Sequence, residues 1–252
     1  MSRKWIFLRG LARSSSHWGS FLDQFKKDFP QDEIELIDLR GNGDLLHSPS
    51  WLSIEDNVRD LRARSRFIQS GCSVHLLSIS LGSMIATEWS RKFPEEIEGA
   101  VLINTSDRGT ASFFHRMRLR NIRHFLSILK NPQQSVASEK IILEMTTNFP
   151  GTEMVIEEWA DIFSKLAPTS RLNFIRQIIA AARYKFPEHK PKTEILILCG
   201  GKDKLVNPIC SERIAKMWTL TTHRHPTGGH DLPLEVGDWV CEQIANWLKE
   251  TE

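Results

Sequence analysis

The chain has 252 residues, of which 25% are charged, and its formal net charge is +2. This length suits one large α/β domain or a core with a smaller insertion. The near-balanced charge argues against a nucleic-acid binder, which needs a strongly basic domain. No apolar run approaches the roughly 18 residues of a membrane-spanning helix, and the N-terminal stretch has too few apolar residues for a secretory signal.

The cysteines give a hint about the compartment. They lie far apart, at Cys72, Cys199, Cys210 and Cys241, and form no Cys-x-x-Cys pair. This spacing is typical of reduced thiols, so we expect a cytoplasmic protein without a disulfide framework or a cysteine metal site.

The first hundred residues alternate between strand and helix patterns. Short apolar runs predict strands at 4–8, 34–39, 74–77 and 100–103. One predicted helix starts near Ser16 and ends at Pro30, and another starts at Ser53, which has a capping partner in Asp56. A third helix follows residue 80 and stops at Pro94.

From residue 108 to about 189 the sequence has only helical periodicity, with helices expected at 111–130, 136–147, 152–165 and 169–184. Strands return at 194–199 and 222–226, each followed by a helix. Such alternation predicts an α/β fold with a mostly parallel sheet and helices on both faces. We therefore expect a core formed by residues 1–107 and 190–252. The helical segment 108–189 is expected to form a cap over the carboxyl edge, where ligands bind.

A sharp corner follows the strand at 74–77. Ser78, Ser80 and Gly82 crowd into it, and helical spacing begins directly at Leu81. An ordinary βα turn could have this composition. The corner also resembles the Gly-x-Ser-x-Gly nucleophile elbow of the α/β-hydrolase family, with Ser78 in place of the first glycine. The resemblance implies a nucleophilic serine at position 80.

Two later loops carry the residue types that a nucleophilic serine needs. Asp203 follows the strand at 194–199, and His230 follows the last strand. The order Ser80, Asp203, His230 is the one this family uses, and both loops are similar to its acid and histidine loops. Asp107, which also follows a strand, is the competing candidate for the acid.

The resemblance also implies an oxyanion site built from backbone N–H groups, here those of Leu81 and of Leu11 after Gly10. The family commonly has His-Gly where this chain has Arg9 and Gly10. One interpretation of Arg9 is an ion pair with a nearby carboxylate. The residues expected to contact the substrate are Arg9, Gly10, Trp18, Phe113 and Met117.

The resemblance covers residues 3–107 and 191–250 and points to cap-bearing serine esterases, loosely like the pimeloyl-carrier-protein methyl esterases. It implies hydrolysis of a carboxylic ester or thioester through an acyl-enzyme on Ser80, without metal or organic cofactor. Alternatives on the same fold are a non-catalytic protein that binds a small ligand, an acyltransferase or a cofactor-free haloperoxidase. A serine at position 80, rather than an aspartate, argues against a haloalkane dehalogenase.

The start of the helical segment is strongly basic. Between positions 108 and 137 there are six cations and no acid, namely Arg108, Arg116, Arg118, Arg120, Arg123 and Lys130. One interpretation is a solvated face balanced by acids elsewhere, such as Glu153, Glu157 and Glu158. The other is a docking surface for an anionic or carrier-linked acyl substrate. The sequence leaves the substrate and the oligomeric state open.

Overall fold

The structure is a computed structural model that describes residues 2–118, 121–124, 127, 136–148, 155 and 169–251. Its described part contains one sheet of six parallel strands in the order β2-β1-β3-β4-β5-β6. The strands are β1 (Lys4–Leu8), β2 (Glu33–Leu36), β3 (Val74–Ile79), β4 (Ile97–Ile103), β5 (Glu194–Gly200) and β6 (Thr222–His225). The predicted α/β fold with a parallel sheet is therefore confirmed.

Alternate residues of each central strand enter different cores. On β1, Ile6 and Leu8 face one cluster of buried side chains, whereas Trp5 and Phe7 face the other. Such burial on both faces explains why the central strands have continuous apolar runs rather than an apolar–polar alternation.

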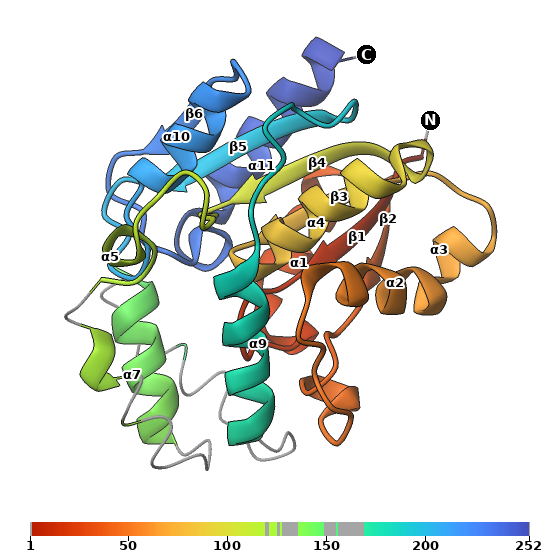
Figure 1. The fold of residues 1–252 in the computed structure, drawn as a ribbon. Helices are drawn as coiled ribbons and strands as arrows, with labels where there is room; N and C mark the ends of the chain where they lie inside the picture. The colour runs from red at the N-terminus through yellow and green to blue at the C-terminus, as the bar shows by residue number, and fades with distance from the viewer. Residues whose placement is uncertain are drawn as a thin grey trace.

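Helices cover both faces of the sheet (Figure 1). The first face is covered by α2 (Ile54–Arg64), α4 (Leu81–Lys92) and α10 (Ile209–Met217), and the second by α1 (Phe21–Asp28) and α11 (Leu232–Thr251). The short α3 (Arg66–Gln69) follows α2. Ser53 begins α2 as predicted, because its hydroxyl accepts the N–H of Asp56 at 3.1 Å.

Between β4 and β5 the structure describes α5 (Phe113–Arg116), α7 (Val136–Thr146) and α9 (Arg171–Arg183). We call residues 108–189 the β4–β5 insertion. Figure 1 shows α7 and α9 on one side of the sheet, away from the two chain termini. Within the described residues, no helix is long and apolar enough to cross a membrane.

Several predicted boundaries are wrong. The helix expected near Ser16 begins as a 3₁₀ turn, and α1 starts only at Phe21, while the second strand ends at Leu36 instead of Leu39. The helix expected over 111–130 breaks at Met117, which is extended (φ −143°, ψ 111°). Beyond the break, the N–H of Arg118 binds the carbonyl of Leu205, a contact from a distant loop. The helix expected over 152–165 lies outside the described residues, apart from position 155.

Candidate active site

The turn between β3 and α4 holds Ser80 in a strained backbone conformation, with φ +56° and ψ −113°. Non-glycine residues adopt positive φ rarely, and such strain clusters at functional sites. Gly82 makes the turn possible, because a Cβ there would lie 2.4 Å from the carbonyl oxygen of Leu8 on β1. Ser80 remains half-exposed although β3 and α4 around it are buried.

The replacement of the usual first glycine by Ser78 has a structural reason. Its side chain is fully buried, and its hydroxyl donates a 2.7 Å hydrogen bond to the carbonyl of Val101 on β4. A small polar side chain thus fits between the strands with its hydrogen bond satisfied. This departure from the pattern leaves the turn geometry of Ser80 intact.

Asp203 and His230 come together at the carboxyl edge of the sheet. Asp203 Oδ2 lies 2.6 Å from His230 Nδ1, and both side chains are buried. The other carboxylate oxygen of Asp203 accepts the N–H groups of Leu205 and Val206 at 2.7 and 2.9 Å. This carboxylate is therefore fixed in orientation, and it holds the histidine ring by one nitrogen.

The competing acid, Asp107, has a different environment. One of its oxygens accepts the backbone N–H and the hydroxyl of Thr110, and the other accepts the N–H groups of Gly109 and Phe186. The carboxylate is fully buried and organises the turn after β4. In the described part of the chain no histidine forms a hydrogen bond with Asp107, so its geometry favours a structural role.

The loop after β1 lies against Ser80. A Cβ at Gly10 would be 3.3 Å from Ser80 Cβ and 3.9 Å from Ser80 Oγ. Leu81 is the first residue of α4, where backbone N–H groups have no partner within the helix. The next residue after Leu11, Ala12, donates its N–H to Gln177 Oε1 on α9 at 2.9 Å, which ties this loop to the β4–β5 insertion.

Asn104, which directly follows β4, holds two loops of the candidate site together. Its side-chain oxygen accepts the N–H of Gly200, while its amide nitrogen donates to the carbonyls of Gly229 and His230 at 3.0 and 2.7 Å. The residue has φ +48°, in the left-handed region that asparagine tolerates. The sequence analysis missed this role, although its position after a strand was a usable signal.

The C-terminal end of α7 rests on the histidine loop. The carbonyl of Thr146, the last residue of the helix, accepts the N–H groups of His230 and Asp231 at 2.7 and 2.9 Å. Asn148 donates to the carbonyls of Lys202 and Thr227. The loops that carry Asp203 and His230 are thus both bonded to the β4–β5 insertion.

The residues expected to contact substrate are placed differently from one another. The Arg9 guanidinium is buried and pairs with Asp231, in agreement with the ion-pair interpretation. Trp18 is also interior, with 1% of its surface exposed, and packs on Phe7. These two side chains therefore belong to the protein interior rather than to an open binding surface. Phe113 is 55% exposed, and Met117 is half-buried.

The basic stretch is only partly a solvated surface. Arg116 donates to the carbonyls of Ala181 and Ala182 at the end of α9, where a cation also complements the helix dipole. Arg108 and Arg123 are exposed. Arg120 and Lys130, as well as the balancing acids Glu153, Glu157 and Glu158, lie outside the described residues.

Glu235 lies under the histidine loop and accepts the N–H of Gly229 at 3.1 Å. Burial raises its pKa to about 7, with Asp231 adding to the effect, although the N–H groups of Asn148 and Gly229 and the charge of Lys204 act in the opposite direction. The folded protein therefore binds this proton more tightly than the unfolded chain, in which a glutamate has a pKa of about 4.3.

We expect Glu235 to lower the free energy of unfolding as pH rises from about 5 through 7, because folding then requires a buried charge. Glu235→Gln keeps an oxygen for Gly229 and removes the titration. Urea unfolding at pH 5 and pH 8 should show the variant gaining stability relative to wild type at pH 8. A difference between the two proteins that is the same at both pH values would contradict this assignment.

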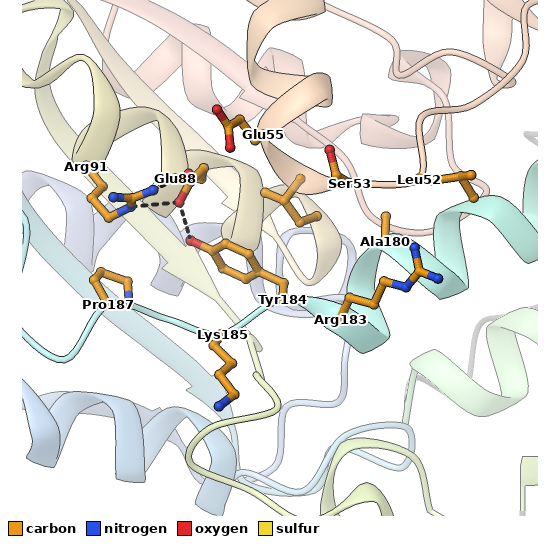
Figure 2. Close-up of a pocket in the computed structure, with 11 residues that line it drawn as sticks. Leu52, Ser53, Glu55, Glu88, Arg91, Ala180, Arg183, Tyr184, Lys185 and Pro187 are labelled. Carbon is orange, nitrogen blue, oxygen red and sulfur yellow. Dashed lines mark hydrogen bonds and ion pairs between the residues drawn. The ribbon is translucent and has the colours of Figure 1, made fainter.

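A separate pocket of about 410 Å³ lies between the start of α2, the second half of α4, the end of α9 and the segment leading to β5. In Figure 2 the hydroxyl of Tyr184 points to Glu88, to which it donates at 3.3 Å, and Arg91 pairs with the same carboxylate. Ser80, Asp203 and His230 are not among its lining residues. The pocket is therefore distinct from the candidate active site. The two are connected through α4, which begins after Ser80 and contributes Glu88 and Arg91 to the pocket.

Comparisons with solved structures place this geometry in a known fold. The chain superimposes on a hydrolase from Oleispira antarctica with a TM-score of 0.78 and 16% identity, over 99% of this chain and 92% of that one. An enol-lactonase from Burkholderia xenovorans LB400 matches with a TM-score of 0.76 and 15% identity, over 99% and 92%. A thermophilic esterase from Thermogutta terrifontis matches with a TM-score of 0.73 and 18% identity, over 100% and 91%.

None of the curated proteins compared with the chain matches it. The family model described as "Alpha/beta hydrolase family" matches residues 5–243, which is nearly the whole chain. The match spans the turn at Ser80, both loops at the carboxyl edge and the β4–β5 insertion between them. The chain belongs to the α/β-hydrolase family.

Proposed function

We propose that the protein is a serine hydrolase that cleaves a carboxylic ester or thioester through an acyl-enzyme on Ser80. The observation that carries the proposal is the 2.6 Å contact between Asp203 and His230, at the same sheet edge as the strained turn of Ser80. A nucleophile, a base and an orienting acid, each after a different parallel strand, are what acyl transfer needs.

In the proposed reaction, the Ser80 hydroxyl attacks the acyl carbon while His230 takes its proton. Because Nδ1 of His230 faces the Asp203 carboxylate, the Nε2 nitrogen is the one that accepts the proton. Collapse of the tetrahedral intermediate expels the alcohol or thiol, which receives this proton. Water, activated by the same histidine, then releases the acid and regenerates Ser80.

The N–H groups of Leu81 and Leu11 are the proposed donors to the oxyanion. Support comes from the position of Leu81 at the start of α4 and from the contact of Gly10 with Ser80. Donors that are fixed before the reaction stabilise the developing charge without reorganisation. The hydrogen bond between Ala12 and Gln177 holds the backbone next to Leu11 in place.

We propose that the β4–β5 insertion, residues 108–189, is the cap of this site and shapes the space for a small-molecule acyl substrate. The contacts of Thr146 with the histidine loop and of Gln177 with the loop after β1 support this role. The exposed Phe113 and Phe114 would suit the entrance for an apolar acyl group. Arg108 and Arg123 are exposed cations that would attract an anionic or carrier-linked substrate.

The proposal is tested by labelling with a fluorophosphonate, which reacts with activated serines. Intact mass should show one adduct, and peptide mapping should place it on Ser80. A panel of esters and thioesters of increasing acyl length then identifies the substrate class. Turnover together with labelling supports the hydrolase, whereas an unlabelled protein that binds acyl compounds without hydrolysing them would be a binding protein.

A further inference from the structure

A buried ion pair lies beside the proposed base. Arg9 donates to Asp231 through both terminal nitrogens, from Nη1 to Oδ1 at 3.1 Å and from Nη2 to Oδ2 at 2.6 Å. The side chains are 4% and 6% exposed, so water screens the pair very little. The two residues are 222 positions apart in the chain, which shows that the contact is built by the fold and not by local sequence.

The pair joins the two loops whose spacing the reaction depends on. Arg9 directly precedes Gly10 in the loop that lies against Ser80, and Asp231 directly follows His230. The Arg9 guanidinium also lies 4.9 Å from the Trp18 ring, and the N–H of Asp231 is held by the carbonyl of Thr146. Each partner is therefore fixed on its own loop, and the planar two-bond contact fixes the loops relative to each other.

Arg9 also balances the charge next to the histidine. Burial works to raise the pKa of Asp231, but the charges of Arg9, Arg13 and His230 and the hydrogen bonds from Arg9 hold it below its usual value. Asp231 is consequently a carboxylate at neutral pH. In the part of the chain that the structure describes, the charged groups around His230 and Asp231 include Asp203, Arg9, Arg13 with its partner Glu139, Glu235 and Lys204. The buried His17 lies near Arg9 and Arg13, and burial together with these two charges holds its pKa well below the usual value.

We propose that Arg9 and Asp231 form a positioning pair with two roles. The pair fixes the loop after β1, which carries Gly10 and Leu11, against the histidine loop, and the charge of Arg9 balances that of the Asp231 carboxylate beside His230. This inference rests on the proposed function and extends it to residues that would touch neither substrate nor reacting atoms. It also accounts for an arginine at the position where the family commonly has histidine. If Arg9 balances the charge of Asp231, removing Arg9 and removing the Asp231 charge should shift the pH dependence of activity in opposite directions.

The first test compares Arg9→Met with Asp231→Asn. Without Arg9, the unbalanced carboxylate favours protonated His230, so the acid limb of the kcat/KM profile should move to higher pH by about one unit. Without the Asp231 charge, the unbalanced guanidinium should move the limb in the opposite direction by a similar amount. The double variant Arg9→Met/Asp231→Asn should have its acid limb close to that of wild type.

A second comparison separates geometry from charge. Arg9→Lys keeps the positive charge but cannot form the planar two-bond contact. We expect its acid limb to stay in place while kcat falls about tenfold with little change in KM, because loop alignment matters in the transition state. As a control, Arg62→Met breaks the ion pair with Glu96 at the amino edge of the sheet, in which Nε and Nη2 of Arg62 both donate to the carboxylate, and it should leave kcat and the pH profile unchanged.

A readout without turnover keeps this inference separate from the proposed function. In a Ser80→Ala background, the titration of His230 is followed by NMR of labelled histidine, with His230→Gln to assign its signal. Midpoints that move in opposite directions for Arg9→Met and Asp231→Asn support the proposal even if no ester is hydrolysed. Midpoints that move in the same direction, or that do not move, overturn it, and Asp231→Asn alone decides the sign if Arg9→Met does not fold.

Discussion

Ser80→Ala is expected to lower kcat for ester hydrolysis by about 10⁴-fold or more while leaving the fold intact. The side chain is half-exposed, and its hydroxyl forms no hydrogen bond to the described residues, so its loss creates no buried unpaired group. Steady-state rates on an activated ester measure the effect, and circular dichroism checks the fold.

Ser90→Ala is a matched control for this loss of activity. Ser90 lies on α4, the helix that begins directly after Ser80, and is buried, but its hydroxyl donates to the carbonyl of Ala86 within the same helix. We expect its kcat to equal that of wild type. Near-normal hydrolysis by Ser80→Ala would remove Ser80 as the nucleophile and with it the acyl-enzyme mechanism.

Asp203→Asn should lower kcat by about 10⁴-fold, the loss seen when a triad acid is made neutral. The amide cannot act as a carboxylate toward His230 Nδ1, so the ring loses its fixed tautomer and the stabilisation of its protonated form. Rates are compared with those of Asp107→Asn, in which the same change is made to the competing acid.

For Asp107→Asn we expect a lower thermal midpoint and a kcat within about tenfold of wild type. Its carboxylate organises the turn after β4 through Thr110, Gly109 and Phe186, so its loss loosens structure and not chemistry. A collapse of kcat in Asp107→Asn together with normal rates in Asp203→Asn would reverse the assignment of the acid.

The sheet was predictable because its signals are local. Continuous apolar runs such as Ile195–Leu198 mark strands that are buried on both faces, and Pro30 and Pro94 mark helix ends. The helix expected over 111–130 was not predictable as broken. Its interruption at Met117 goes with a hydrogen bond from Arg118 to Leu205, and no helical period contains information about that distant loop.

The candidate site also has a part that could be predicted from the sequence and a part that could not. Ser80, Asp203 and His230 follow strands in a recognisable order, so their placement at one sheet edge could be read from the sequence, and their catalytic roles stay predictions. The contacts that hold these three residues in place could not be predicted from the sequence. The Thr146 carbonyl is a backbone group without a side-chain signature, and nothing local marks Asp231 as the partner of Arg9.

The attachment of α7 to the loops of Asp203 and His230 has a consequence for how members of this family can be recombined. A segment inserted between two strands of the core is an obvious candidate for replacement by the corresponding segment of another family member. Here, however, the Thr146 carbonyl and the Asn148 amide of that segment complete the hydrogen bonding of the histidine and acid loops. A chimera in which another segment replaces residues 108–189 must therefore also supply a hydrogen-bond acceptor for the backbone N–H of His230.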